Sequence, residues 1–241
     1  ITLGIGLFVW LPVRNQKKEL RVRDGFVVTV LFWLVLSLSG SIPLYLSDFP
    51  DLRFVDAYFE SLSGLTTTGA TVITGIDILP KSILWYRQQL QWLGGMGLIV
   101  LAVAILPMLG IGGMQLYRAE APGPVKDSKL TPRITETAKA LWYIYLGLTV
   151  ACALAYWAAG MTVFDAISHS FSTIAIGGYS THDASIGFFD NTAIELIAIF
   201  FMFTAGINFA LHFTAWRSNS WVTYFRDPEF RFYGSLMIIV T

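Results

Sequence analysis

Two glycine-containing segments carry the residue types that could bind a cation through the main chain. Residues 66–71 read Thr-Thr-Thr-Gly-Ala-Thr and residues 175–180 read Ala-Ile-Gly-Gly-Tyr-Ser, with Gly69 and Gly178 offset by 109 positions (178 − 69). Glycine adopts backbone dihedrals that other residues avoid, so such a turn can direct successive carbonyl oxygens toward an ion and replace its water. Each segment follows one uncharged run of membrane length and precedes another. This pattern indicates a cation-selective pore loop.

The candidate ligands of this pore loop are backbone carbonyl groups on both segments. In the second segment two glycines compete, because the offset selects Gly178 while Gly177 is adjacent and would line the same path. The candidate ion contacts are Thr67, Thr68, Gly69, Ile176, Gly177 and Gly178. The neighbouring filter positions are Thr66, Ala70, Ala175 and Tyr179. No transition-metal site is expected, because the spacing of the three histidines does not match a ligand set.

The composition is that of an integral membrane protein. The chain has 241 residues, of which 55% are hydrophobic and 13% charged, and its mean hydropathy is +0.61. A soluble domain carries roughly 25% charged residues, so a soluble enzyme or nucleic-acid-binding protein is not expected. Cys152 is the only cysteine, which excludes an intramolecular disulfide.

The elements that must position the two loops are long and short apolar runs. A helix needs about 20 apolar residues to cross a bilayer. Four runs meet that length: residues 26–46, 88–116, 140–164 and 196–216. The runs 54–66 and 163–175 are too short and predict half-spans that enter the membrane and turn at the glycines. The chain opens and closes inside apolar stretches, so we expect a fragment of a longer protein.

The basic residues predict the orientation of these spans. All lysines and arginines except Arg53, Lys81 and Arg87 fall on one side of the span model, which is therefore cytoplasmic. The opposite side carries seven aspartates: Asp48, Asp51, Asp56, Asp77, Asp165, Asp183 and Asp190. The half-spans therefore enter from outside, through an acidic vestibule that would concentrate cations.

The same offset of 109 relates other residues of the two half-spans. Asp56 aligns with Asp165, and serines and an alanine align nearby. One repeat forms one wall of a pore, and two walls do not enclose an ion. The expected organisation is the end of a transmembrane helix (1–13), a basic cytoplasmic loop (14–25), a first repeat (26–114), a cytoplasmic linker (115–135), a second repeat (136–217), a cytoplasmic loop (218–231) and the start of a third repeat (232–241).

Several of these segments resemble a known family. Residues 61–71 and 172–183, together with 117–123, 129–133 and 136–139, are similar to the TrkH/TrkG-type potassium uptake proteins of the Trk/Ktr/HKT superfamily. The resemblance implies an all-α membrane fold in which four units of helix, pore helix and helix surround a pseudo-fourfold ion pore. This chain would contain two of the four units.

The resemblance also implies a function and partners. It implies potassium uptake across the bacterial plasma (inner) membrane by a multi-pass subunit, with K⁺ bound by the filter carbonyls and no covalent cofactor. It implies a TrkA-type cytoplasmic nucleotide-binding regulatory subunit, a homodimer of the full-length protein, contact with membrane lipid, and no nucleic acid. It implies no enzymatic activity.

Three alternatives stay open. A potassium-channel filter has a second glycine in each loop, and Thr71 and Ser180 stand at those places, so a monovalent cation transporter with low K⁺/Na⁺ selectivity is the first. An intramembrane enzyme using Asp165, His169 and Ser170 is a remote second. A non-conducting scaffold is the third.

Several other polar residues have two possible interpretations each. Glu60 and His169 occupy equivalent positions on the half-spans and could tune the vestibule or link to neighbouring spans. Arg87 could extend toward the interface or pair with Glu60 or Asp77. Asn208 and His212 could face a cavity below the filter or form hydrogen bonds between helices. Residues 94–97, Gly-Gly-Met-Gly, predict close helix packing.

Overall fold

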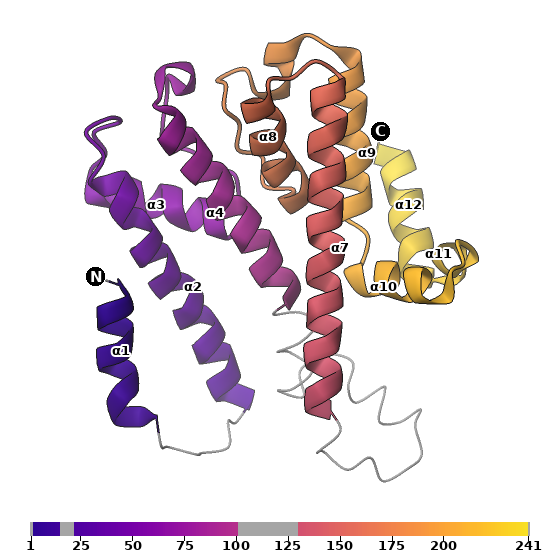
Figure 1. Cartoon of the computed structure of the whole chain (residues 1–241), viewed down its shortest axis with the longest axis horizontal. Helices are drawn as coiled ribbons and strands as arrows, with labels where there is room; N and C mark the ends of the chain where they lie inside the picture. The colour runs from indigo at the N-terminus through magenta and orange to yellow at the C-terminus, as the bar shows by residue number, and fades with distance from the viewer. Residues whose placement is uncertain (1, 15–21, 101–129, 241) are drawn as a thin grey trace.

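The computed structural model describes residues 2–14, 22–100 and 130–240, which are helical and contain no strand in those ranges (Figure 1). The first repeat comprises α2 (Val22–Tyr45), α3 (Phe54–Leu65) and α4 (Lys81–Val100). The second comprises α7 (Leu130–Ala158), α8 (Val163–Ala175), α9 (Thr192–Ala205) and α10 (Phe209–Ser218). The flanking helices are α1 (Thr2–Val13), α11 (Val222–Arg226) and α12 (Pro228–Val240), and the short 3-10 helices are η1 (Ile76–Ile78) and η4 (Ser185–Phe189).

The two short helices, α3 and α8, have the bounds expected of the half-spans to within one residue. Their 12 and 13 residues extend only about 20 Å at 1.5 Å per residue. Thr162 begins α8 because its Oγ1 accepts a hydrogen bond from the backbone N–H of Asp165, at 3.1 Å. Asp56 and Asp165 lie in the first turns, where a carboxylate complements the helix dipole.

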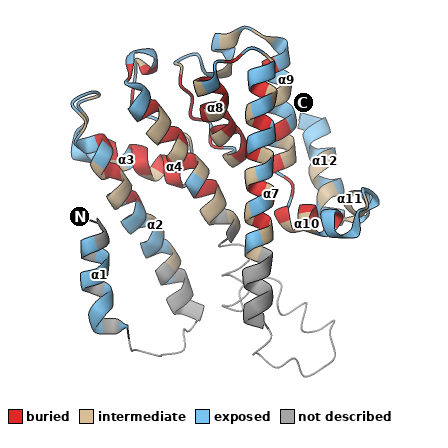
Figure 2. Ribbon diagram, viewed as in Figure 1, coloured by how far each residue is buried: buried red, intermediate tan, exposed pale blue. Residues whose placement is uncertain are grey.

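The buried part of the molecule surrounds these short helices. Figure 2 shows buried residues on α3, on α8 and along α4, whereas α12 has none. One apolar cluster in the first repeat includes Leu44, Leu65 and Leu90, and one in the second includes Tyr145 and Tyr156. The short helices also bury polar residues: Glu60, Ser61 and Ser63 on α3, and Ser168, His169, Ser170 and Ser172 on α8.

The predicted membrane spans are only partly matched by single helices. Within the described ranges, Ala138–Ala158 of α7 is the one segment long and apolar enough to cross a membrane unbroken. The described apolar part of α2, Thr29–Tyr45, is shorter. The predicted run 88–116 corresponds to α4 as far as Val100, and its remainder lies outside the described residues.

The predicted span over residues 196–216 is not one unbroken helix. The chain bends by 87° between α9 and α10. Asn208 begins α10 by accepting a hydrogen bond from the backbone N–H of Ala210 at 3.0 Å, and a residue that caps a new helix cannot also continue the preceding one. Gly206 lies against the hydroxyl group of Tyr233, where a Cβ atom would not fit. The Asn208 cap therefore gives the bend a local cause at the start of α10.

Three predicted loop boundaries also need correction. The basic loop was expected to reach residue 25, but α2 begins at Val22. The linker was expected to reach residue 135, but α7 begins at Leu130, and residues 115–129 lie outside the described ranges. The loop 218–231 contains α11, and α12 begins at Pro228 instead of residue 232. Proline suits the first turn of a helix, and Asp227 caps this turn by accepting from the N–H of Phe230 at 2.9 Å.

Candidate ion filter

The two glycine-containing loops share an unusual backbone. In the first loop Thr67 and Gly69 have φ of 54° and 76°. In the second, Ile176 and Gly178 have φ of 52° and 85°. The residue between each pair, Thr68 or Gly177, is not left-handed. Left-handed and ordinary residues therefore alternate at equivalent positions of both loops.

This alternation matters because it reorients successive peptide groups. In an extended strand, neighbouring carbonyl groups point in opposite directions, and a left-handed residue at every second position turns them toward a common side. Left-handed Thr67 and Ile176 are strained by about 1–3 kcal/mol each, a cost that persists only where the surroundings impose it. Such strain is concentrated at functional sites.

Hydrogen bonds from α3 impose this backbone on the first loop. The N–H groups of Thr67 and Thr68 donate to the carbonyl oxygens of Gly64 and Ser63, at 3.0 and 2.9 Å. Ser63 Oγ donates to the carbonyl oxygen of Ala70 at 2.6 Å. The Ala70 carbonyl is therefore occupied by Ser63, so we leave it out of the candidate ion ligands.

Five of the six candidate carbonyl groups have no donor. Within the described part of the chain, no N–H or O–H group donates to the carbonyl oxygens of Thr67, Thr68, Gly69, Ile176 or Gly178. Thr68, Ile176 and Gly178 are exposed, and Thr67 and Gly69 are partly exposed. Accessible carbonyl oxygens without a donor are free to replace part of the water shell of a cation.

The sixth candidate carbonyl, that of Gly177, is bound by Gln91 of α4. Gln91 Nε2 donates to the Gly177 carbonyl oxygen at 2.7 Å, and Gln91 Oε1 accepts from the N–H of Tyr179 at 3.0 Å. Gln91 is fully buried. A Cβ atom on Gly177 would lie 2.7 Å from Gln91 Nε2, closer than real contacts allow.

The two adjacent positions therefore require glycine for different structural reasons. Gly178 needs its left-handed backbone, like Gly69, whereas Gly177 has an ordinary φ and makes room for Gln91. Sequence reasoning did not identify Gln91. The available signal was a glutamine within an apolar run, four residues after Arg87 and so on the same helix face.

A buried ion pair lies behind both loops. Arg87 Nε donates to Glu60 Oε1 at 2.8 Å, and both side chains are 0% exposed. Arg87 Nη2 reaches Thr71 Oγ1 at 3.1 Å, and Nη1 reaches the Ser180 carbonyl oxygen at 3.3 Å. Of the two predicted readings, Arg87 thus pairs with Glu60, and Glu60 links its half-span to α4.

Tyr179 connects the second loop to the first. Its hydroxyl group donates to the carbonyl oxygens of Glu60 and Ala70, at 2.8 and 3.3 Å. The guanidinium carbon of Arg87 lies 4.3 Å from the centre of its ring, a cation–π geometry. The predicted filter neighbour Tyr179 is therefore a cross-repeat contact with its ring buried.

The glycines of α4 bring that helix against the ends of both short helices. A Cβ atom on Gly94 would overlap the Leu65 carbonyl group, and one on Gly95 would lie 2.7 Å from the Tyr145 hydroxyl oxygen and 3.0 Å from the Ala175 Cβ. The predicted close packing is confirmed for these two positions. One face of α4 thus contacts both candidate filter loops through Arg87, Gln91 and the glycines.

Residues that follow the two loops, on the side predicted to face outward, form hydrogen bonds with each other. Asp183 accepts from the N–H groups of Ile76 and Asp77, at 2.9 and 3.3 Å. Asp77 Oδ1 lies 2.6 Å from His182 Nδ1. The N–H bond from Ile76, above all, lowers the pKa of Asp183 below its ordinary value. We call Asp77, His182 and Asp183 the outer clasp.

The remaining polar residues form links within the helical framework. His169 Nε2 lies 2.9 Å from Ser180 Oγ. His212 contacts the Thr204 carbonyl oxygen and the Tyr224 hydroxyl group, at 3.0 and 2.8 Å. Asn208 Nδ2 donates to Glu229 Oε2 at 3.0 Å, so hydrogen bonding between helices is the reading of Asn208 and His212 that the structure supports.

Ser170 and His169, which the enzyme alternative requires, are not hydrogen-bonded to each other. Ser170 Oγ donates to the Ile167 carbonyl oxygen at 2.7 Å and not to His169. The described ranges contain no group of three or more metal-ligating side chains.

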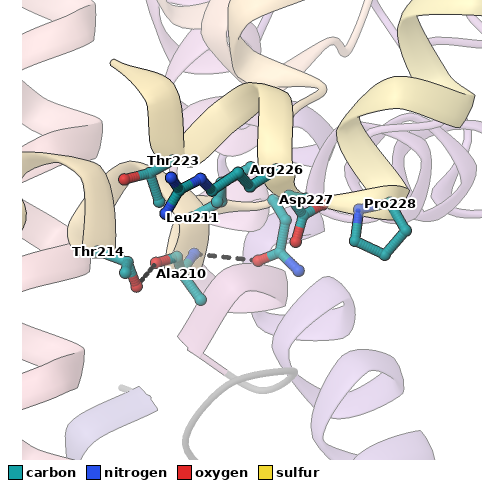
Figure 3. A pocket seen from close by; sticks show the side chains of 8 residues that line it. Ala210, Leu211, Thr214, Thr223, Arg226, Asp227 and Pro228 are labelled. Carbon is teal, nitrogen blue, oxygen red and sulfur yellow. Dashed lines mark hydrogen bonds between the residues drawn. The ribbon is translucent and has the colours of Figure 1, made fainter. Parts of the chain in front are cut away.

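A pocket of about 410 Å³ lies away from the filter, between α10 and the start of α12 (Figure 3). Its lining residues are Asn208, Ala210, Leu211, Thr214, Thr223, Arg226, Asp227 and Pro228. Two of the hydrogen bonds in it are internal to α10 and its cap. None of the candidate filter residues lines it, so its volume has no bearing on the ion site.

Comparison with known proteins identifies the family. The family model described as TrkH, a cation transport protein, matches residues 1–239. The chain belongs to the TrkH family. The resemblance of the two loops to that family is thereby confirmed, as is the helical fold.

Individual relatives agree with this assignment. The chain is 68% identical to the Trk system potassium uptake protein TrkH of Halomonas elongata, over 96% of this chain and 48% of that protein. It is 47% identical to TrkG of Escherichia coli, over 98% of this chain and 50% of that protein. The structure is similar to the crystal structure of the potassium transporter TrkH from Vibrio parahaemolyticus, with a TM-score of 0.86 and 57% identity over 98% of this chain and 48% of that one. The chain spans about half the length of these TrkH-family relatives.

Proposed function

We propose that this chain forms two of the four walls of a potassium-selective filter in a Trk-type uptake system. Each wall is one unit of helix, pore helix and helix, with α3 and α8 as the pore helices. The ion ligands are the carbonyl oxygens of Thr67, Thr68 and Gly69 in the first loop, with Ile176 and Gly178 in the second. The Gly177 carbonyl, bound to Gln91, is left out of this set.

The observation that carries this proposal is the alternating left-handed backbone with unpaired carbonyls, at equivalent positions of two loops. Potassium is a large, singly charged ion whose water shell several carbonyl dipoles can replace without binding it too tightly for release. The names of the relatives, potassium uptake proteins, support the same ion.

The partners proposed follow from the family. The protein is a multi-pass subunit of the bacterial inner membrane that works with a TrkA-type cytoplasmic nucleotide-binding subunit and forms a homodimer at full length. The transport of K⁺ needs no covalent cofactor and no enzymatic step.

The test uses a chimera in which this chain replaces the matching half of the Halomonas elongata relative. It is expressed in a bacterium that lacks its own potassium uptake, and growth is measured at low potassium with low and high sodium. We expect the chimera to support growth. Gly69→Ser should abolish growth or admit sodium, because Gly69 has φ of 76° and its Cβ would overlap the Gly177 carbonyl.

Gly187→Ser is the matched control, because Gly187 has no positive φ and no atom near its would-be Cβ. It should grow like the unmodified chimera. If Gly69→Ser grew as well as the unmodified chimera and Gly187→Ser, Gly69 would only form an ordinary turn. A chimera that reaches the membrane but takes up no potassium would overturn the proposed function itself.

A second candidate is a K⁺/Na⁺ transporter of low selectivity. Thr71 and Ser180 stand where a channel filter has its second glycine, and both are held by the buried network: Thr71 Oγ1 donates to Glu60, and the Ser180 carbonyl accepts from Arg87. The Ser180 carbonyl is then not free for a further ion site, which favours weaker discrimination. Uptake of ²²Na⁺ by the chimera in competition with K⁺ distinguishes the two.

A further inference from the structure

We propose that Gln91 determines the ion selectivity of this filter, by holding the Gly177 carbonyl away from the ion. This inference rests on the proposed function. Gln91 would then be a positioning residue on α4 that does not itself touch the ion. The two walls would differ in the number of carbonyl oxygens that they offer to the ion.

The inequality appears when equivalent residues are compared. Thr68 and Gly177 are related by the offset of 109 (177 − 68). The Thr68 carbonyl has no donor in the described part of the chain, whereas the Gly177 carbonyl accepts from Gln91 Nε2 at 2.7 Å. At this level of the filter the first wall offers an oxygen to the ion and the second wall does not.

The chemistry requires an amide at position 91. Gln91 donates to one backbone group and accepts from another two residues along, the N–H of Tyr179. Only a side chain with both a donor and an acceptor makes these two bonds at once. A glutamate would keep the bond from Tyr179 but would repel the Gly177 carbonyl oxygen, and an apolar side chain would leave both backbone groups unpaired in the interior.

The second repeat has no counterpart of this residue. Position 200 is equivalent to position 91 (200 − 91 is again 109), and it holds Phe200, which is 61% exposed. The amide therefore acts on one wall only. In a filter built from four unlike walls, one wall can lack a carbonyl ligand that another wall supplies. The loss of that ligand changes how closely the ring of oxygens fits the ion.

Gln91 and Gly177 depend on each other for space. A Cβ atom on Gly177 would lie 2.7 Å from Gln91 Nε2, and Gly177 has no positive φ to require a glycine. The three atoms nearest to that Cβ all belong to Gln91, so we expect Gly177→Ala to fail because of Gln91. Removing the glutamine should restore the space.

The experiment measures Rb⁺ and Na⁺ uptake by the chimera and four variants: Gly177→Ala, Gln91→Ala, the double variant, and Gly178→Ala combined with Gln91→Ala. We expect Gly177→Ala to lose uptake. Gln91→Ala should transport Rb⁺ with a KM ratio for Na⁺ over Rb⁺ that falls about five- to tenfold, the effect of one lost hydrogen bond. The double variant should recover uptake with the same lowered ratio. Gly178 has φ of 85°, so its double variant should stay inactive.

Two further variants separate selectivity from folding. Gln91→Glu keeps the size of the side chain and should show the lowered ratio, with uptake normalised to membrane abundance because a buried carboxylate destabilises the fold. Gln88→Leu removes a second buried glutamine of α4 whose amide atoms have no partner in the described ranges, and it should keep the ratio of the unmodified chimera.

Three outcomes would contradict either this inference or the proposed function. A ratio unchanged in both Gln91→Ala and Gln91→Glu would overturn the inference, since Gln91 would then only fill space. A double variant as inactive as Gly177→Ala would also overturn it, because Gly177 would then serve the ion directly. Absence of Rb⁺ uptake in the unmodified chimera would instead overturn the proposed function.

Discussion

Arg87 and Glu60 form an ion pair at 2.8 Å that is completely buried, one residue on α4 and the other on the short helix α3. Burial of two charges is costly, and the pair is retained in protein interiors only when further hydrogen bonds complete it. Here those bonds go to Thr71 and Ser180, the last residues of the two candidate filter loops. The pair therefore holds the first loop and the second loop against one helix.

Loss of one partner of this pair should be severe. Arg87→Met leaves Glu60 buried and unpaired, and we expect it to lower the free energy of unfolding of the chimera by about 3–5 kcal/mol. Adding Glu60→Gln should recover part of the loss, because no uncompensated charge then remains. Denaturant unfolding in detergent measures both. Arg53→Met is the control: its pair with Asp56 has an Arg53 side chain 87% exposed and should contribute about 0–1 kcal/mol. Equal losses for both arginines would contradict the prediction.

Gly95→Ala should damage the contact between α4 and α8. Its Cβ would lie 2.7 Å from the Tyr145 hydroxyl oxygen and 3.2 Å from the Ala175 Cα, and we expect a cost of about 1–3 kcal/mol from overpacking. Gly97→Ala is the matched control, because among the described residues its Cβ would meet only the Trp33 ring, at 3.4 Å. Thermal unfolding of the two variants should separate them, and a Gly95→Ala protein as stable as Gly97→Ala would refute the close packing.

The outer clasp should depend on pH through Asp183. Its folded pKa lies below the unfolded value, chiefly because of the N–H bond from Ile76. A group with a lowered folded pKa stabilises the protein above its unfolded pKa, and this stabilisation disappears as the pH falls through the lowered folded value.

Asp183→Asn should therefore lower the melting temperature of the chimera at neutral pH, and the difference from wild type should shrink in acid. Asp190→Asn, which removes another outer carboxylate, controls for net charge. A difference that stays constant from neutral to acid pH would show that Asp183 has no such role.

The bend between α9 and α10 should respond to Asn208→Ala. The change removes the cap of α10 and the bond to Glu229, and loss of a cap costs about 0.5–2 kcal/mol. Thr214→Ala on the exposed face of α10 should stay within about 0.5 kcal/mol of wild type. Unfolding midpoints that coincide for the two variants would argue against Asn208 as the cause of the bend.

The features that depend on local chemistry could be predicted from the sequence. The short helices α3 and α8 follow from charged residues at their starts and glycines after their ends, so their bounds were predictable. Gly69 and Gly178 were paired by the offset alone, and both have the left-handed backbone that pairing implies.

The rest depends on contacts between distant residues. The choice between Gly177 and Gly178 could not be made from the loop itself, because it depends on Gln91, which is 86 positions away. The bend after Ala205 was hidden because the apolar run continues through Gly206 and Asn208. Hydropathy averages the polarity of a segment, so it does not show that a single polar residue begins a new helix.

The contact of Tyr179 with Glu60 and Ala70 has a consequence for the order in which the protein is made. The ribosome delivers the first loop to the membrane well before residue 179 exists, so the Ala70 carbonyl waits for one of its two partners until the second repeat has been inserted. The first loop therefore acquires its full set of hydrogen bonds only after the second repeat has been inserted.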